Sequence, residues 1–132
     1  MNDATVKQYR TIISQYWKFF QEVLSNDFGT DAMWSKAIKQ TGELQKIHQC
    51  RLSERMTYVV LDEMDKIQKL KENPDLKIYY NVFLDCGNAI GRANDWDTFC
   101  DFIKGRFARY DGMRFAEIMF DLFQREAAEN MT

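Results

Sequence analysis

Apolar side chains recur every three to four positions along most of this chain, which is the period of an α-helix. The pattern is clearest in residues 3–25, where they share an arc of roughly 160° on a wheel of about 100° per residue. They are Val6, Tyr9, Ile12, Ile13, Tyr16, Trp17, Phe19, Phe20, Val23 and Leu24. This arc predicts an amphipathic helix with a buried face rich in aromatic rings.

Capping and breaking residues divide the rest of the chain into similar segments. The first helix is expected to stop in the sequence SNDFG at 25–29, and Thr30, Ser53, Asp75 and Asp95 are suitable N-caps for later helices. Helices are therefore predicted over residues 3–25, 30–49, 53–72, 75–93, 95–110 and 112–128, the last two being either separate or one bent helix. Because no strand pattern occurs and the connections are short, we expect an all-α, single-domain bundle of five or six mostly antiparallel helices.

Two of these segments are apolar over most of their circumference. In residues 75–93 the few polar side chains lie within about 80° of arc, so this helix is expected to be central and the most buried. Its Gly87 and Gly91 indicate either close approach of another helix or a break in this one. In residues 112–128 the apolar arc is about 220°, which calls for packing partners on more than one side.

The composition is that of a folded protein, and the net charge excludes strong electrostatic attraction to nucleic acid or to a membrane. The chain has 132 residues, 45% hydrophobic and 29% charged, with a formal net charge of -2, so no global field attracts nucleic acid or an anionic membrane. No apolar run reaches the roughly 20 residues that span a bilayer, and the first residues lack a signal-peptide pattern. Cys50, Cys86 and Cys100 have no CxxC spacing, which indicates reduced thiols and a cytoplasmic location, with an intermolecular disulfide as the alternative.

His48 and Glu63 both project from the apolar faces of their predicted helices. Because an unpaired buried charge is costly, each should have a partner, either the other or Arg106. The favoured interpretation is an internal polar network that fixes the register of the helices. The alternative is a ligand-binding or hydrolytic site around His48 and Glu63.

Motifs for cofactors and metals are missing from the sequence. The chain has one histidine, no HExxH, no Walker A loop and no GxGxxG, so we expect neither a bound metal nor a cofactor. In each of the pairs Glu117/Asp121 and Asp97/Asp101, the two carboxylates lie on one face of a predicted helix, and all-α hydrolases hold Mg²⁺ with acidic residues on helices. Aspartates in the first turn of a helix are explained more simply, because they interact favourably with the helix dipole.

Residues 104–114 mix basic and aromatic side chains, as nucleic-acid binders do. On a helical wheel Lys104, Arg106 and Arg109 diverge and the rings fall on the core side, so the segment is better interpreted as two helix ends. A nucleic-acid-binding regulator that uses Lys104, Arg106, Arg109 and Arg114 is kept as a lesser alternative.

The pattern as a whole favours a small helical protein that is not an enzyme and works through protein contacts, as an interaction, accessory or regulatory module. Its apolar faces are wide enough to suggest a protein partner or self-association as a homodimer through the sixth or the fourth helix. An accessory protein of bacterial or mobile-element origin would fit this size. We expect no membrane partner.

Overall fold

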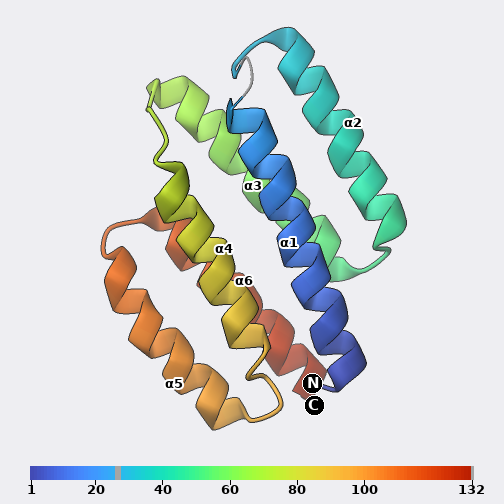
Figure 1. The fold of residues 1–132 in the computed structure, drawn as a ribbon, viewed down its shortest axis with the longest axis vertical. Coiled ribbons are helices and arrows are strands. Elements are labelled where there is room, and N and C mark those ends of the chain that lie inside the picture. Colours follow the sequence, from blue (N-terminus) through green and yellow to red (C-terminus); the bar gives the residue numbers. More distant parts are fainter. Residues whose placement is uncertain (26–27, 132) are drawn as a thin grey trace. The chain divides into compact units, whose positions relative to one another are not determined.

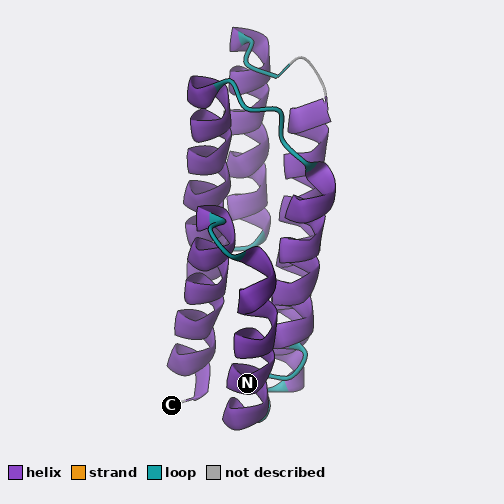
Figure 2. Ribbon diagram, turned by 90° about the vertical axis from the view of Figure 1, so that its left-hand side faces the viewer, coloured by secondary structure: helices purple, strands orange, loops and turns teal. Residues whose placement is uncertain are grey.

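The computed structural model describes residues 1–25 and 28–131, and within these ranges it consists of helices joined by short loops, without a strand (Figures 1 and 2). The α-helices of the described residues are α1 (Asp3–Ser25), α2 (Asp31–Ile47), α3 (Arg51–Leu70), α4 (Leu76–Ile90), α5 (Trp96–Phe107) and α6 (Arg114–Met131). A 3₁₀ helix, η1 (Ala108–Tyr110), directly follows α5. The prediction of an all-α bundle of five or six helices is confirmed, with six α-helices in the described residues.

Several predicted helix starts are confirmed by hydrogen bonds of the capping side chains. The Thr30 hydroxyl accepts from the backbone N–H of Met33 at 3.1 Å, and the Asp95 carboxylate accepts from the N–H of Asp97, also at 3.1 Å. Asp75 likewise accepts from the N–H of Lys77 at 3.0 Å, just where α4 begins. Helix α1 ends at Ser25, and residues 26–27 of its predicted stop lie outside the described residues.

Ser53 is not the N-cap of α3, contrary to the prediction. The helix begins two residues earlier, at Arg51, and Ser53 is fully buried inside it. The hydroxyl of Tyr16 lies 2.9 Å from the Ser53 hydroxyl and 2.6 Å from that of Thr57, and it donates to the Ser53 carbonyl at 2.8 Å. Ser53 therefore belongs to a buried cluster of hydroxyl groups, because a buried polar side chain needs a hydrogen-bond partner.

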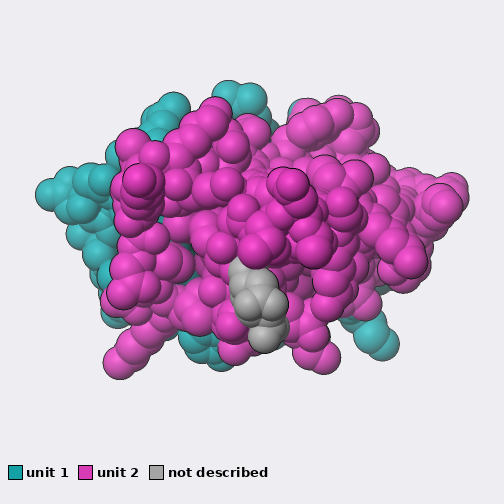
Figure 3. Space-filling model, turned by 90° about the horizontal axis from the view of Figure 1, so that it is seen from above, with its two compact units in different colours: residues 1–14, 78–132 teal, residues 15–77 magenta. Residues whose placement is uncertain are grey.

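The chain groups into two compact units, which Figure 3 shows in separate colours. One unit comprises residues 15–77, with the later part of α1, α2 and α3, and the other comprises residues 1–14 and 78–132. Within each unit, consecutive helices run in opposite directions (Figure 1), as their short connections require. That the units form one domain stays a prediction of the sequence.

Aromatic rings hold together the unit of residues 1–14 and 78–132. The Phe115 ring of α6 lies 5.1 Å from Tyr79 and 5.9 Å from Phe83 of α4, measured between centroids. The Phe120 ring lies 5.7 Å from Tyr110 of η1. Such edge and tilted pairs add about 0.5–1.5 kcal/mol each to the burial of the rings. Helix α6 is thus fixed to α4 and to the end of α5.

Helix α4 buries about half of its residues, which is about as large a share as any other helix of the described residues, but it is not covered on every side. Ile78, Tyr80 and Leu84 are 42%, 43% and 45% exposed, so one face of α4 is open to solvent. The helix ends at Ile90, and Gly91 lies in the turn that follows. A side chain at Gly87 would meet nothing within 4 Å, so the prediction of a close helix approach there is wrong and the helix break is observed.

No helix in the described part of the chain has both the length and the apolar character needed to cross a membrane.

Candidate functional site

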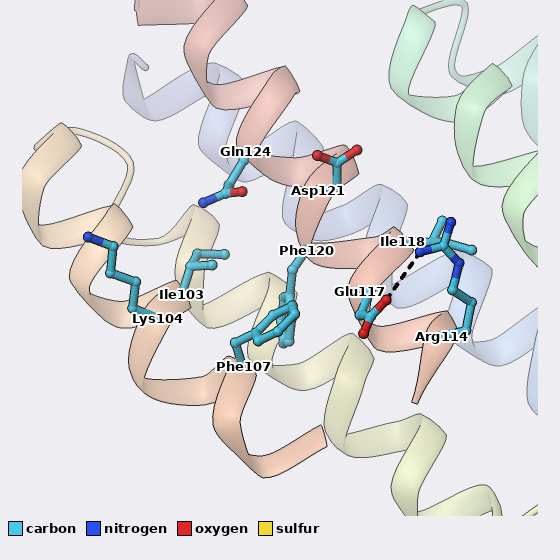
Figure 4. Close-up of a pocket in the computed structure, with 9 residues that line it drawn as sticks. All are labelled: Ile103, Lys104, Phe107, Arg114, Glu117, Ile118, Phe120, Asp121 and Gln124. Carbon is cyan, nitrogen blue, oxygen red and sulfur yellow. Dashed lines mark hydrogen bonds and ion pairs between the residues drawn. The ribbon is translucent and has the colours of Figure 1, made fainter. Parts of the chain in front are cut away.

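Helices α5 and α6 pack against each other and leave between them a groove of about 540 Å³ (Figure 4). The whole groove belongs to the unit of residues 1–14 and 78–132. It is lined by Ile103, Lys104, Phe107, Arg114, Glu117, Ile118, Phe120, Asp121 and Gln124. We call it the α5–α6 groove.

The floor of the α5–α6 groove is apolar. Ile103 and Phe120 are buried, whereas Phe107 is 44% exposed. The ring centroids of Phe107 and Phe120 lie 6.2 Å apart, with the two ring planes tilted to each other, and Figure 4 shows both rings on the floor of the groove. A half-exposed phenylalanine beside a buried one gives the groove an apolar surface that a partner can cover.

The two rims of the groove differ in charge, although the α6 rim carries a cation, Arg114, beside its two carboxylates. Lys104 stands on α5, while the carboxylates of Glu117 and Asp121 stand on α6 (Figure 4). Arg114 pairs with Glu117 at 3.1 Å, and Arg125 pairs with Asp121 at 3.0 Å, each pair within one helix. Because these ion pairs are largely exposed, each contributes about 0–1 kcal/mol to stability and is easily exchanged for a pairing with another molecule.

The turn between η1 and α6 sets the angle at which the rims face each other. Gly112 has φ +78°, a left-handed conformation that glycine adopts without steric cost. The N–H of Met113 then donates to the carbonyl of Tyr110 at 2.9 Å, which closes the turn before α6 begins. The turn expected at YDG, residues 110–112, is therefore confirmed, and it reverses the chain so that α6 packs along α5.

A buried polar cluster in the same unit was missed by the sequence analysis. The Tyr110 hydroxyl of η1 donates to Oδ2 of the buried Asp85 on α4 at 2.6 Å, and Arg106 Nε lies 3.8 Å from Oδ1. Burial, followed by the hydrogen bond and negative charge of Asp85, raises the pKa of Tyr110 above its usual value. Asp85 sits among the polar positions of α4, and its partner is 25 residues away, so no local spacing reveals the pair.

Arg106 is held by this cluster and by a ring. Its guanidinium carbon lies 4.8 Å from the centroid of Phe102, and that of Arg92 lies 4.3 Å from the same centroid. Cation–π contacts of this length stabilise the cations by about 0.5–2 kcal/mol. Arg106 therefore faces Asp85 and Phe102, and it is not among the residues that line the α5–α6 groove.

The four basic residues proposed for nucleic-acid binding thus fall into three places. Lys104 and Arg114 line the α5–α6 groove, and Arg114 is paired there with Glu117. Arg106 faces Asp85, and Arg109 is exposed on η1. The structure brings together only Lys104 and Arg114, on opposite sides of an apolar floor.

His48 and Glu63 lie apart in the unit of residues 15–77. His48 is the C-cap of α2, where its N–H donates to Leu44 and its ring Nε2 lies 2.5 Å from Oε1 of Gln15. Glu63 is buried, as predicted, and lies 3.9 Å from the Lys66 ammonium. From the start of α3 at Arg51 to Glu63 the helix rises by roughly 18 Å, so the two residues do not form a direct pair, and a ligand site shared by them has no support in this geometry.

The described residues contain no group of three or more His, Cys, Asp or Glu residues placed to hold a metal ion. Cys50, Cys86 and Cys100 are free thiols. Burial, with a smaller effect of the Asp85 charge, raises the pKa of Cys86 well above its usual value, which keeps this thiol protonated and unreactive.

Comparisons with protein-family models, with curated proteins and with solved structures give no match.

Proposed function

We propose that this protein is a non-enzymatic interaction module that docks an amphipathic helix of a protein partner in the α5–α6 groove. The observation that carries this proposal is the apolar floor of Ile103, Phe107 and Phe120 between two rims that carry charged side chains. Two packed helices with an apolar furrow between them accept the apolar face of a third helix, as in helix-in-groove recognition.

The groove specifies the chemistry of the docked helix. Apolar side chains at positions i, i+3 or i+4, and i+7 would lie over Phe107 and Phe120. The edge of the helix next to Lys104 should be acidic, and the edge next to Glu117 and Asp121 should be basic. Covering the exposed part of Phe107 contributes on the order of 1 kcal/mol, so several such anchors are needed for measurable affinity.

Synthetic helical peptides and nuclear magnetic resonance test this proposal. A peptide with the apolar face and charged edges described above is titrated into ¹⁵N-labelled protein at low concentration. We expect amide shifts to concentrate at Lys104, Phe107 and Asp121, and a peptide with its two charged edges exchanged to bind about tenfold more weakly.

Two variants complete that experiment. Phe107→Glu places a charge on the groove floor and should abolish the shifts, whereas Tyr58→Glu alters an exposed aromatic side chain of α3 and should leave them unchanged. Peptide-induced shifts that spread evenly over the protein, or that survive Phe107→Glu, would show that the groove is not a docking site.

A further inference from the structure

We propose that the helix that fills the α5–α6 groove is α6 of a second copy of this chain, so that the protein forms a two-fold symmetric homodimer. This inference rests on the proposed docking function and names its partner. It follows from two features of α6, an exposed apolar side chain and a particular order of charges.

Helix α6 carries a side chain suited to its own groove. Ile118 is 37% exposed and lies about 160° around α6 from Phe120, which forms the floor. Figure 4 places Ile118 beside Arg114, at the side of the groove away from Lys104. One helix therefore presents an apolar depression along one edge and an apolar projection along the other, which is the self-complementarity that a two-fold interface requires.

A two-fold arrangement lets both copies use these features at once. If α6 of each copy lies antiparallel along α6 of the other, each Ile118 points toward the groove of the opposite copy and approaches its Phe107. Helices α5 and α6 of both copies then form four packed helices with the two α6 helices in contact, a common arrangement in helical assemblies. Phe107 and Ile118, both exposed in one copy, become covered in the pair.

The charges along α6 select this antiparallel pairing. Arg114 stands four positions before Ile118, and Asp121 stands three positions after it. A two-fold axis beside Ile118 therefore places Arg114 of each copy opposite Asp121 of the other, which gives two ion pairs across the interface. The ion pairs that Arg114 and Asp121 now make within α6 are exposed and weak, so exchanging them costs little.

Lys104 supplies a further complementary charge. It stands on the α5 rim, over which the second copy of α6 would lie with its carboxylates Glu117 and Asp121. A parallel pairing would instead bring Arg114 of one copy against Arg114 of the other, and like charges would face each other along the whole contact.

The exposed face of α4 is the rival surface for self-association. Ile78, Tyr80 and Leu84 make it partly apolar. Between Leu76 and Ile90, however, the one carboxylate is the buried Asp85, so α4 offers no exposed negative charge to pair with Lys77 of a second copy. Charge complementarity therefore favours α6 over α4.

Sedimentation equilibrium over a wide range of protein concentrations tests the inference. We expect the wild-type mass to rise from 15.7 kDa toward twice that value, with a dissociation constant on the order of micromolar for a contact of this modest size. Ile118→Glu should weaken association about 100-fold, and Tyr58→Glu should leave it unchanged. Both changes lie at exposed positions, so both variants are expected to fold, which circular dichroism checks.

A charge exchange gives the sharper result. Arg114→Glu alone and Asp121→Arg alone should each weaken association about tenfold, because each sets like charges opposite each other across the axis. The double variant, with Arg114→Glu and Asp121→Arg together, should recover wild-type association to within about threefold. Failure of the double variant to recover, or a dimer that tolerates Ile118→Glu, would overturn the inference.

The outcomes separate this inference from the proposed function. If the wild type stays monomeric at every concentration and the synthetic peptide still shifts the groove amides, the groove binds a different protein and the homodimer is wrong. If the wild type stays monomeric and the peptide also fails to bind, both proposals are wrong.

Discussion

The hydrogen bond between Tyr110 and Asp85 gives the most direct test of what stabilises α5, η1 and α6 against α4. Tyr110→Phe removes one hydroxyl group and keeps the ring, which is buried and lies 5.7 Å from Phe120. The lost hydroxyl donates to the Asp85 carboxylate at 2.6 Å. The substitution therefore removes only one hydrogen-bond donor from the buried, charged carboxylate of Asp85.

The loss of stability can be estimated because the substitution removes only one hydrogen bond. A hydrogen bond to a charged group contributes about 1.5–3 kcal/mol, and removal of the donor also leaves the acceptor less well satisfied. Arg106 at 3.8 Å offsets part of this loss. We expect Tyr110→Phe to lower the free energy of unfolding by about 2 kcal/mol, whereas the matched control Tyr58→Phe, at an exposed position of α3, should change it by less than about 0.5 kcal/mol.

Urea denaturation followed by circular dichroism measures both variants against the wild type. The midpoint of Tyr110→Phe should fall while the denaturant dependence, m, stays the same. If Tyr110→Phe and Tyr58→Phe shift the midpoint equally, the buried hydrogen bond does not stabilise the fold and the reasoning is refuted.

The same residue predicts a dependence on pH. Because burial and Asp85 raise the pKa of Tyr110 in the folded state, the folded protein keeps this proton at pH values where the unfolded chain, with a pKa near 10.0, has lost it. The contribution of Tyr110 is thus fully present below about pH 10 and declines as the pH rises further, by at most about 1.4 kcal/mol per pH unit. Tyr110→Phe should remove this part of the alkaline slope; equal slopes for variant and wild type would contradict it.

Three further predictions concern other side chains of the two units. Arg106→Met should lower the free energy of unfolding by about 1–3 kcal/mol, because it leaves the buried carboxylate without its cation, while the exposed control Arg109→Met should change it by less than about 0.5 kcal/mol. Tyr16→Phe should lower the free energy of unfolding, measured by thermal denaturation, by about 1–2 kcal/mol, because the Tyr16 hydroxyl is hydrogen-bonded in a buried cluster of hydroxyl groups. On heparin at low salt we expect weak retention; strong retention that is lost when Lys104, Arg109 and Arg114 are changed together to Ala would favour nucleic-acid binding instead.

Local sequence signals predicted the helices well because the period and the caps act within a few residues. Thr30, Asp75 and Asp95 each accept a backbone N–H that lies two or three positions ahead. Ser53 has the same capping chemistry, but its hydroxyl is satisfied by Tyr16, 37 residues earlier in the chain. Tertiary contact overrode the local preference at that position.

The candidate site depends on packing between segments, which the pattern of one helix does not contain. Lys104 and Arg114 belong to two different helices, yet they line one groove because the turn at Gly112 folds α6 back along α5. Conversely, the apolar periodicity identified Glu63 correctly as buried, but it did not show that His48 ends its helix beside Gln15. The periodicity of one helix shows which of its side chains point toward the core. Which residue such a side chain contacts also depends on the rotation and length of the neighbouring helix.

The central claim, that the α5–α6 groove docks a helix, is tested most directly by ¹⁵N–¹H spectra of the protein recorded while the synthetic helical peptide is added. We expect the amide signals of Lys104, Phe107 and Asp121 to move with peptide concentration, while those of the α4 face, such as Leu84, stay fixed. Signals that move on α4 while those of α5 and α6 stay fixed, or spectra that the peptide leaves unchanged, would contradict the claim.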